Sequence, residues 1–361
     1  MKVVVFGLAM SSSWGNGHAT LWRGLVRALA RRGHHVTFFE RDLPFYAANR
    51  DLHDLPGGEL VIYPDWDSVA DRARRAVAEA DVAMVTSYCP DAPEAERLVV
   101  AAPRAARLFY DLDTPVTLAA LEGPERPAYV GARGFADYDL VLSYTGGAAL
   151  AALRDRLGAR RVAPLYGHVD PDVHRPATPD AGEISALTYL GTYAADRQPA
   201  LERLFVVPAR LRPERRFTLG GAQYPADFPW TPNIFFRRHL PPAAHPAFFA
   251  AGRMTLNVTR AAMAAMGHCP SGRLFEAAAC GTALLSDGWE GLDDFFVPGS
   301  EILVADTTES ALAALDLSDA AVARIAQAGR ARVLADHTSD RRALDFEAAV
   351  ASLAVPQGEP N

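Results

Sequence analysis

The sequence predicts an α/β protein of two facing Rossmann-like domains with parallel sheets and a central cleft, and three observations support this fold class. The chain has 361 residues, enough for two domains of ordinary size. Short apolar runs alternate with helical patterns, which is typical of βαβ units. A stretch rich in Pro and Asp, residues 169–180, separates two such series. Because ligands bind outside the carboxyl ends of parallel strands, we expect the chemistry in the loops that follow them.

The first series of strands starts at the N-terminus. An apolar run at 3–6 is closed by Gly7, and a loop rich in Ser, Gly and Asn runs to Gly17. A helix over 18–32 then places apolar residues at helical spacing on one face. Further strands are expected at 36–39, 60–63, 82–86, 107–110 and 140–143. Together these elements define an N-terminal domain, residues 1–168.

The second series follows a predicted linker at 169–182. Its strands are expected at 186–190, 217–220, 234–237, 254–258, 283–286 and 302–305. They define a C-terminal domain, residues 183–345, and the remaining residues, 346–361, are interpreted as a C-terminal tail with a frayed end.

Composition restricts the function classes. Half of the residues are hydrophobic and 22% are charged, as in ordinary globular proteins. The formal net charge of −7 disfavours a nucleic-acid partner, because phosphate neutralisation needs a basic surface. No apolar run approaches the roughly 18 residues of a membrane span. The three cysteines are widely spaced and odd in number, which favours reduced thiols and a cytoplasmic protein. The oligomeric state is not indicated.

The strongest motif lies between His268 and Gly291. Pro270 and Ser271 stand where a helix should begin, with Ser271 as the expected N-cap, and Gly281 ends the helix. A helix N-terminus offers unpaired N–H groups and the positive end of a dipole, so that it can bind a diphosphate. Plain packing of a helix with a small-residue face is the simpler alternative.

Side chains of this motif suggest a division of roles in donor binding. Ser271 and Gly272 would place backbone N–H groups against the diphosphate, and Arg273 would add a fork of charged donors. Glu276, one turn into the helix, could accept hydrogen bonds from the ribose hydroxyls. Trp289 and Glu290 follow the next strand and are expected on the same rim.

This region resembles the C-terminal domain of CgeB-type (spore maturation protein) glycosyltransferases, relatives of the retaining GT-B class. The segments that carry the resemblance are YLGTY at 189–193, LNVTR at 256–260, FEAAACG at 275–281, SDGWEGL at 286–292 and PGSEIL at 298–303. The resemblance implies a GT-B glycosyltransferase that transfers a sugar from a nucleoside-diphosphate sugar to an unknown small-molecule or glycan acceptor. It also implies that residues 1–168 form the acceptor side and residues 183–345 the nucleotide-sugar donor side. It implies no cofactor and no metal, since GT-B enzymes use helix dipoles and basic side chains instead.

His268 departs from the family pattern. Retaining GT-B enzymes usually carry a second glutamate eight residues before the glutamate that corresponds to Glu276, and here that position is His268. The ribose role can be carried over to Glu276, whereas the sugar-contact role of the second glutamate cannot. An imidazole can hydrogen-bond a hydroxyl or stabilise a phosphate, so His268 is a catalytic candidate, with an incidental loop histidine as the alternative.

The loop before the first helix supplies further candidates. Gly15, Asn16 and Gly17 would permit close approach of the backbone to the donor, and His18 would face the cleft as a catalytic residue. The alternative is a simple loop that leads into the helix.

Asp111 and Asp113 form an Asp-x-Asp pair after a predicted strand. Such a pair holds a metal in a different, single-domain glycosyltransferase fold. In the fold predicted here, Asp113 is interpreted as a catalytic residue that contacts the acceptor or acts as a base. Formation of a turn with Thr114 and Pro115 explains it equally well.

Four more donor-binding candidates follow strands of the second domain. Thr192 and Arg197 come after its first strand, and Arg260 follows Thr259, all placed to contact a diphosphate. His239 follows the third strand, where GT-B proteins contact the base through backbone groups. The alternative for Arg197 is that its side chain is simply solvated at the surface and contacts no ligand.

Three other functions stay open. A nicotinamide-dependent enzyme could use Glu40 at the end of the second strand, but the glycine fingerprint is missing after Gly7. A nucleotide-sugar mutase or epimerase remains compatible with His268 at the family's glutamate position. A non-catalytic nucleotide-sugar-binding protein would share the donor site without turnover. The sequence does not identify the base, the sugar, the acceptor or the stereochemical outcome.

Overall fold

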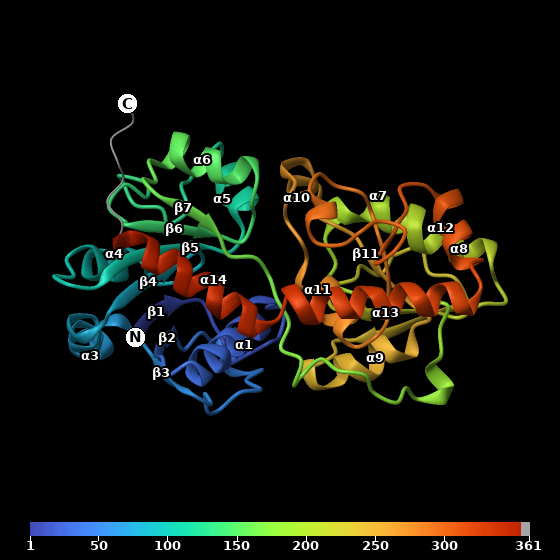
Figure 1. Cartoon of the computed structure of the whole chain (residues 1–361), viewed down its shortest axis with the longest axis horizontal. Helices are drawn as coiled ribbons and strands as arrows, with labels where there is room; N and C mark the ends of the chain where they lie inside the picture. The colour runs from blue at the N-terminus through green and yellow to red at the C-terminus, as the bar shows by residue number, and fades with distance from the viewer. Residues whose placement is uncertain (355–361) are drawn as a thin grey trace. The chain divides into compact units, whose positions relative to one another are not determined.

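A computed structural model describes residues 1–354 and divides the chain into two compact units. Unit 1 comprises Met1–Tyr166 together with the chain from Ser339 onward, and unit 2 comprises Gly167–Thr338. Each unit contains a single sheet with helices packed on it, and all pairings between its strands are parallel (Figure 1). The prediction of two Rossmann-like domains with parallel sheets is therefore confirmed.

The sheet of unit 1 has seven strands in the order β3-β2-β1-β4-β5-β6-β7. Their bounds are β1 Lys2–Gly7, β2 His35–Arg41, β3 Gly58–Tyr63, β4 Val82–Thr86, β5 Ala106–Asp111, β6 Leu140–Ser143 and β7 Val162–Pro164. The strand order reverses between β1 and β4, which is where open parallel sheets of this kind bind ligands. The edge strand β7 was not predicted, because a run of three residues that ends in Pro is too short to indicate a strand.

Helices of unit 1 cover both faces of this sheet. They are α1 His18–Arg31, α2 Pro44–Ala47, α3 Trp66–Glu79, α4 Ala92–Val100, α5 Thr114–Ala120, α6 Ala148–Leu157 and α14 Ser339–Ala351, followed by the short turn η6 Ser352–Ala354. Helix α1 buries Leu21, Leu25 and Leu29 along one face, as its spacing predicts. Asp65 caps α3 by accepting a hydrogen bond from the Ser68 N–H.

The C-terminal helix α14 belongs to unit 1, which differs from the predicted domain boundaries. The sequence assigned residues up to 345 to the C-terminal domain and 346–361 to a tail. In the structure Ala343 and Phe346 are buried in the core of unit 1, and the Glu347 carboxylate pairs with Arg32 at 2.6 Å. Burial of this apolar face explains the return of the chain, and residues 355–361 lie outside the described part.

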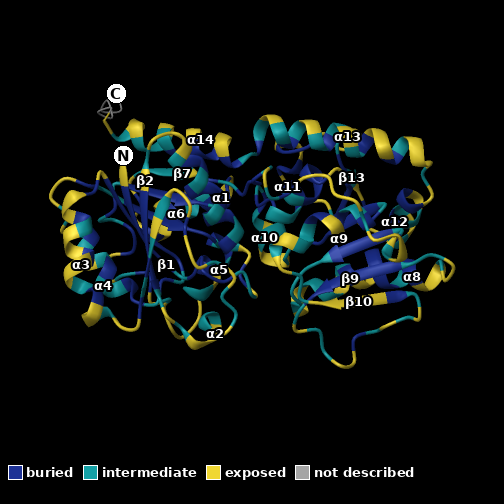
Figure 2. Cartoon of the chain, turned by 90° about the horizontal axis from the view of Figure 1, so that it is seen from below, coloured by how far each residue is buried: buried dark blue, intermediate teal, exposed yellow. Residues whose placement is uncertain are grey.

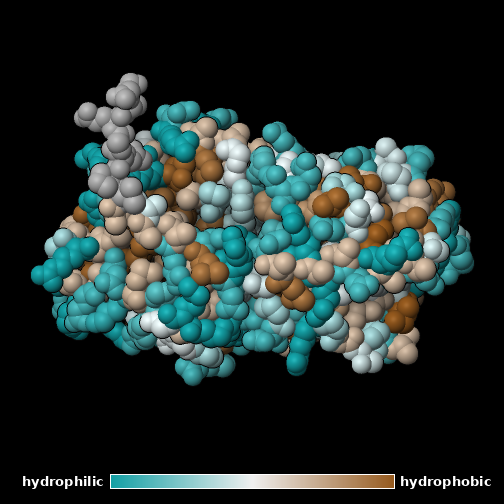
Figure 3. Space-filling view, viewed as in Figure 1, coloured by the Kyte–Doolittle hydropathy of each residue, from teal (hydrophilic) through white to brown (hydrophobic). Residues whose placement is uncertain are grey.

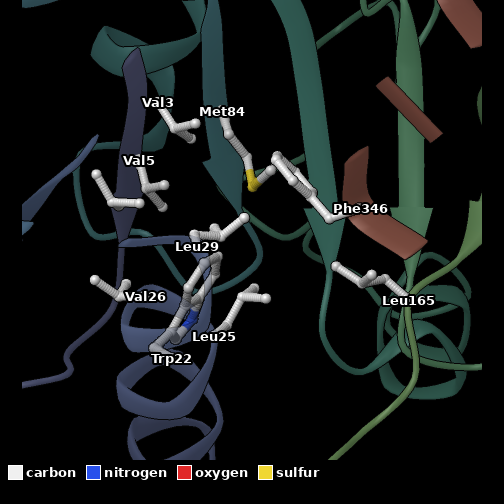
Figure 4. Close-up of a pocket in the computed structure, with 10 residues that line it drawn as sticks. Val3, Val5, Trp22, Leu25, Val26, Leu29, Met84, Leu165 and Phe346 are labelled. Atoms are coloured by element: carbon white, nitrogen blue, oxygen red, sulfur yellow. The ribbon is translucent and has the colours of Figure 1, made fainter. Parts of the chain in front are cut away.

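Phe346 lines a small apolar pocket in unit 1 together with residues of β1, β4 and α1. Figure 4 shows its ring beside Met84, with Trp22 and Leu25 of α1 on the opposite wall. The lining residues are Val3, Val5, Trp22, Leu25, Val26, Leu29, Val36, Met84, Leu165 and Phe346. Because this lining is wholly apolar, the pocket is part of the hydrophobic core.

The sheet of unit 2 has six strands in the order β10-β9-β8-β11-β12-β13. Their bounds are β8 Leu187–Leu190, β9 Phe217–Gly221, β10 Ile234–Arg238, β11 Met254–Asn257, β12 Ala283–Ser286 and β13 Leu303–Val304. All six lie where the sequence predicts them. The central strands are buried, whereas the edge strand β10 is mostly exposed (Figure 2).

Unit 2 also includes the stretch 169–182, which was predicted as a linker. Val169 and His174 in this stretch are buried, so these residues are packed rather than extended between domains. The helices and helical turns of unit 2 are η1 Ala181–Glu183, η2 Ala195–Arg197, α7 Gln198–Leu201, η3 Glu202–Val206, α8 Val207–Leu211, η4 Pro242–Ala244, α9 His245–Ala251, α10 Ala261–Met266, α11 Gly272–Ala279, η5 Leu292–Asp294, α12 Thr308–Leu315 and α13 Asp319–Asp336.

Among residues 1–354, no helix combines the length and the apolar character that crossing a membrane requires. On the face shown in Figure 3, apolar side chains occur in small groups between hydrophilic ones. Scattered groups of this kind are ordinary on protein surfaces.

Replacing Phe346 with Ala should destabilise unit 1. The side chain is 1% exposed, and truncation of a buried Phe costs about 3–5 kcal/mol in lost burial and cavity formation. Chemical denaturation should show a lower midpoint for this variant. Leu344→Ala, on the same helix but 42% exposed, is the matched control and should shift the midpoint little. Equal shifts for the two variants would contradict the packing of α14 on unit 1.

Candidate functional site

The loops after β8, β11 and β12 converge at the carboxyl edge of the unit 2 sheet. Parallel pairing of β11 with both β8 and β12 brings the ends of these strands together. Helix α11 begins at the same edge, because its residue Arg273 reaches the side chain of Asn257 at the end of β11. The predicted donor-binding motif therefore lies where parallel sheets bind ligands.

The N-terminus of α11 lies at Ser271. Ser271 occupies the N-cap position with extended backbone angles, and its side chain makes no capping hydrogen bond. The first N–H groups of a helix have no intrahelical acceptor. Gly272 and Arg273 contribute such groups, so this terminus is suited to an anionic ligand. Helix α11 spans eight residues and begins at Gly272, close to the predicted start.

Arg273 is held by neutral groups. Its Nη1 donates a hydrogen bond to Asn257 Oδ1 at 3.1 Å, and its guanidinium lies 5.0 Å from the centre of the Tyr189 ring. Gly191 leaves room for the guanidinium, because a Cβ at Gly191 would lie 2.8 Å from Arg273 Nη2. Burial lowers the pKa of Arg273, and the nearby charge of Arg197 acts in the same direction.

Arg197 stands beside Arg273 and is also without an acidic partner. Its Nη1 donates to the Thr192 carbonyl at 3.4 Å, and its buried Nε has no hydrogen-bond partner. Within the described residues, neither Arg197 nor Arg273 has a carboxylate at ion-pair distance. The structure thus places Thr192 next to Arg197, and Arg197 near Arg273, while their binding of a donor stays a prediction. Two neighbouring guanidinium groups without a counter-ion are suited to bind an anion.

Glu276 lies one turn after Arg273 and faces two histidines. Its carboxylate oxygens are 3.9 Å from His174 Nε2 and 3.9 Å from His245 Nδ1. His245 Nε2 donates a hydrogen bond to the Leu240 carbonyl at 3.1 Å. Burial lowers the pKa of His245, which favours the neutral imidazole. These three side chains could hold a metal ion, although the sequence predicts no metal site.

The sequence did not identify His174 or His245 as site residues. His174 lies in the stretch interpreted as a linker, and His245 begins a short helix with no motif around it. Their sequence separation of 71 residues hides the contact, since only the fold brings the two rings together.

Arg260 differs from the other two arginines because it has an acidic partner. Its Nε lies 3.3 Å from Asp196 Oδ2. The pair is partly exposed, so Arg260 is less dependent on an external anion than Arg197 or Arg273. Its role at the diphosphate stays a prediction.

His268, Trp289 and Glu290 form a second group. His268 has a positive φ of 45°, its N–H donates to the Glu290 carbonyl at 2.7 Å, and its Nδ1 lies 3.0 Å from Asp294 Oδ2. The Trp289 ring packs near Phe295, and its buried Nε1 has no hydrogen-bond partner. Both His268 and Trp289 are therefore oriented by the loop at 289–295, and their roles toward the donor stay predictions.

His239 lies in the turn after β10 and has a positive φ of 41°. Its N–H donates to the Gly221 carbonyl at 2.9 Å, which fixes the turn at the end of β9 and β10. This position at the carboxyl edge is compatible with the predicted backbone contact to a base, which stays a prediction.

In unit 1, His18 and Asp113 lie close together, as expected for two residues of one site. His18 Nε2 is 3.7 Å from Asp113 Oδ2, and the Tyr88 hydroxyl donates to the same oxygen at 3.0 Å. The rings of His18 and Tyr88 stack with centres 6.2 Å apart. This group, His18, Tyr88 and Asp113, combines an acceptor of protons with an imidazole that can relay them.

Tyr88 is a candidate that the sequence analysis missed. It lies two residues after the end of β4, at the carboxyl edge of the sheet, and has a positive φ of 67°, which is unusual outside glycine. Burial raises its pKa, followed by the effect of the Asp113 charge, so that the hydroxyl remains a proton donor to Asp113. Its position after a strand was the only available signal.

Asp111 and Asp113 have different environments, which disfavours a shared metal. Asp111 is fully buried, and its Oδ1 accepts hydrogen bonds from Thr117 Oγ1 at 2.9 Å and from the Asp113 N–H at 3.3 Å. Its Oδ2 has no partner, and burial raises its pKa to about 6. Asp111 therefore supports the loop, while Asp113 faces His18 and Tyr88.

The Asn16 side chain, in the loop before α1, makes its hydrogen bonds to the backbone of the same region. Asn16 Nδ2 donates to the Ala9 carbonyl at 2.8 Å, and its Oδ1 accepts from the His18 N–H at 3.2 Å. Gly15 has a φ of 61°, which favours glycine, whereas Gly17 has ordinary helical angles at the N-cap of α1. Donor binding by these three residues stays a prediction.

Glu40 also serves this loop. Its buried carboxylate accepts hydrogen bonds from the N–H groups of Met10 at 2.8 Å and Ser11 at 2.9 Å, and from the Ser11 hydroxyl. A ribose-binding acid of a nicotinamide enzyme would need a carboxylate open to the ligand. The arrangement weighs against that alternative.

Comparisons with known proteins agree with this architecture. Residues 197–348 match the model of a family described as glycosyl transferase-like. No curated protein sequence is significantly similar to the chain.

Solved structures resemble the chain over nearly its full length. Sucrose-phosphate synthase from Thermosynechococcus elongatus is 14% identical, with a TM-score of 0.68 over 98% of this chain and 99% of that one. HepE from Anabaena, in complex with UDP-glucose, is 14% identical, with a TM-score of 0.66 over 98% and 100%. An alpha-glucosyltransferase in complex with UDP-glucose and DNA is 12% identical, with a TM-score of 0.69 over 97% and 99%. These likenesses show the GT-B fold, while the resemblance to CgeB-type proteins stays a prediction.

Replacing Asp111 with Asn should flatten the dependence of stability on pH. The raised pKa, about 6 against an ordinary 3.8, means that the carboxyl stabilises the fold fully below about pH 4. That contribution is lost as the pH rises to about 6, at a cost of up to about 3 kcal/mol.

The measurement is the free energy of unfolding of wild type and Asp111→Asn between pH 4 and 7. As the pH rises, the free energy of unfolding of wild type should fall relative to that of Asp111→Asn, because only wild type has the carboxyl that ionises. Asp54→Asn, at an exposed aspartate, should run parallel to wild type. Parallel curves for Asp111→Asn as well would show that this carboxyl has an ordinary pKa.

Proposed function

We propose that the chain is a glycosyltransferase that moves a sugar from a UDP-sugar to a small-molecule or glycan acceptor. The observation that carries the proposal is the pair of guanidinium groups, Arg197 and Arg273, which lies near the N-terminus of α11 and makes no ion pair with a carboxylate among residues 1–354. The glycosyl transferase-like match over residues 197–348 supports the reaction class. The UDP and UDP-glucose complexes of structurally similar proteins support uridine as the base.

The diphosphate fits the charge distribution at this end of the sheet. Its oxygens would accept hydrogen bonds from the first N–H groups of α11 and from both guanidinium groups. An anion placed there relieves the repulsion between Arg197 and Arg273 and pairs the buried Nε of Arg197. The same contacts strengthen as the nucleoside diphosphate departs and gains charge, which lowers the barrier to transfer.

Glu276 and His239 are proposed to bind the nucleoside. The carboxylate of Glu276 is a strong acceptor for the two ribose hydroxyls and lies one helical turn from Arg273. The turn fixed by His239 would present backbone groups to the base. His268 would contact the donor sugar at the position where related enzymes carry glutamate.

The group of His18, Tyr88 and Asp113 is proposed to act on the acceptor. Asp113 would accept the proton of the attacking hydroxyl, directly or through His18, while the Tyr88 hydroxyl holds the carboxylate in position. The glycosidic bond to the diphosphate breaks, a bond to the acceptor oxygen forms, and UDP leaves with its negative charge neutralised by the arginines.

A nucleotide-sugar isomerase is the second candidate, favoured by His268 at the family's glutamate position. Incubation of UDP-sugars without acceptor separates the two functions. A new UDP-sugar isomer would contradict the transferase proposal, whereas UDP release that depends on an acceptor would support it.

Replacing Arg273 or Arg197 with Gln should weaken UDP binding by about 1.5–3 kcal/mol, because each variant loses hydrogen bonds to a charged group. Calorimetry with UDP should therefore show a loss of about tenfold to over a hundredfold in affinity. Arg260→Gln is the matched control, since Asp196 already pairs with Arg260. Its loss should be smaller.

The result that would reject the diphosphate site is unchanged UDP affinity in folded Arg273→Gln and Arg197→Gln proteins. Inorganic pyrophosphate provides an independent check, because it contains the same charged oxygens without base or ribose. It should lose affinity in the same two variants.

Replacing Asp113 with Asn should lower kcat by about 10²–10⁴-fold, the usual effect of losing a general base. UDP affinity should stay unchanged, because Asp113 is assigned to the acceptor. The measurement is UDP release from UDP-glucose in the presence of a panel of glycan acceptors. Tyr88→Phe keeps the ring and loses one hydrogen bond, so a smaller loss is expected. A wild-type rate for Asp113→Asn would remove Asp113 from the mechanism.

A further inference from the structure

Three side chains from separate segments of unit 2 direct ligand atoms at a common point. His174 comes from the stretch before β8, His245 begins α9, and Glu276 lies on α11. Their closest nitrogen and oxygen atoms all lie within 4.8 Å of one another. We propose that they form a binding site for a zinc-class transition-metal ion, and that this metal competes with the nucleotide for Glu276.

The distances fit tetrahedral coordination. Zinc bonds of about 2.0–2.1 Å separate neighbouring tetrahedral ligands by about 3.3–3.4 Å. His174 Nε2 and His245 Nδ1 are 3.3 Å apart, which is the separation that a shared metal requires. The carboxylate oxygens of Glu276 are 3.9 Å from the two nitrogens. Rotation of the glutamate side chain would bring one of these oxygens to bonding distance from an ion shared with both nitrogens, so that Glu276 contributes one ligand.

The hydrogen bond of His245 sets the tautomer that a metal ligand needs. A backbone carbonyl can only accept, so the contact of Nε2 with the Leu240 carbonyl at 3.1 Å places the proton on Nε2. The lone pair is then on Nδ1, the atom that faces His174 and Glu276. Metal-binding histidines almost always donate their other N–H to a carbonyl or carboxylate in this way.

The donor set selects the metal. Two imidazole nitrogens and one carboxylate favour zinc and its neighbours, whereas magnesium and calcium prefer oxygen ligands alone. His174 is buried, while the side chains of His245 and Glu276 are 13% and 14% exposed. Solvent can therefore supply a fourth ligand from the exposed side. Two histidines and a glutamate with one open position is a known arrangement for bound zinc.

The metal and the nucleotide should compete because Glu276 is proposed to bind both of them. This competition rests on the proposed function, in which Glu276 binds the ribose. A carboxylate that coordinates a metal offers less negative charge to the ribose hydroxyls. The metal should therefore weaken binding of the nucleoside, and the nucleoside should weaken binding of the metal by the same factor. The metal site itself does not depend on the nucleotide assignment.

The first experiment titrates Zn²⁺ into the full chain after removal of metals with EDTA, without nucleotide. We expect binding of one ion per chain in calorimetry, and Co²⁺ in its place should give the visible absorption of a tetrahedral complex. His174→Gln and His245→Gln should each lower the affinity at least tenfold. Absence of one-to-one binding in wild type, or equal affinity in these variants, would overturn the proposal.

His268→Gln is the matched control. His268 also lies beside a carboxylate, with Nδ1 at 3.0 Å from Asp294, but this pair offers only two ligands. Its loss should leave the affinity for Zn²⁺ unchanged. Thermal unfolding of each variant in EDTA shows whether it is folded, and the Co²⁺ spectrum of wild type tests the site independently of any substitution.

The second experiment repeats the Zn²⁺ titration in saturating uridine, which has a ribose and no phosphate to chelate the metal. A lower affinity for Zn²⁺ supports the competition, and an unchanged affinity overturns it. UDP binding to the metal-free protein is measured separately. A protein that binds Zn²⁺ through His174 and His245 but never binds UDP would contradict the proposed function and leave the metal site standing.

Discussion

The central constraint in unit 2 is the presence of two guanidinium groups that share one edge of the sheet without a carboxylate between them. Burying like charges side by side is unfavourable unless an opposite charge compensates. Arg273 is kept in place by the Asn257 amide, the face of the Tyr189 ring and the space left by Gly191. These neutral groups fix the geometry of Arg273, and the nearby Glu276 carboxylate is the acidic group that acts on its charge. Two positive charges therefore face one negative charge at this edge, which is the basis of the proposed anion site.

In unit 1, the buried carboxylates of Glu40 and Asp111 stabilise loops. Glu40 holds the backbone of Met10 and Ser11, so its carboxylate shapes the loop that leads to His18. Asp111 supports the loop after β5 through Thr117. The carboxylates of Glu40 and Asp111 accept hydrogen bonds from the loops that they support. Asp113 instead contacts His18 and Tyr88. The loop geometry therefore decides which acid can take part in chemistry.

Local patterns in the sequence predicted the elements whose signal is local. All strands except β7, and the start of α11, follow from apolar runs and cap residues. The rule that parallel strands end at one edge accounts for the proximity of Arg197 and Arg273. Contacts between distant segments could not be predicted in this way. Helix α14 packs on unit 1 through Phe346, far from the strands it covers.

The two histidines near Glu276 were not predicted as site residues, because their contact also joins distant segments of the chain. His174 and His245 meet only because a stretch rich in Pro and Asp folds back onto unit 2, and nothing in its composition specifies that packing. Tyr88 was missed because a single tyrosine after a strand carries no motif, although its backbone strain marks it once the fold is known.

Charge at Glu276 connects the donor site with the proposed metal site. Arg197 and Arg273 contribute two positive charges near α11, and Glu276 contributes one negative charge. Under the proposed function, this site would attract a diphosphate and keep one strong acceptor for the ribose. A divalent ion at Glu276 would add positive charge and remove that acceptor. The diphosphate would then be held at least as well, and the nucleoside less well. Metal binding would therefore change which part of the donor is recognised, because one carboxylate serves both ligands.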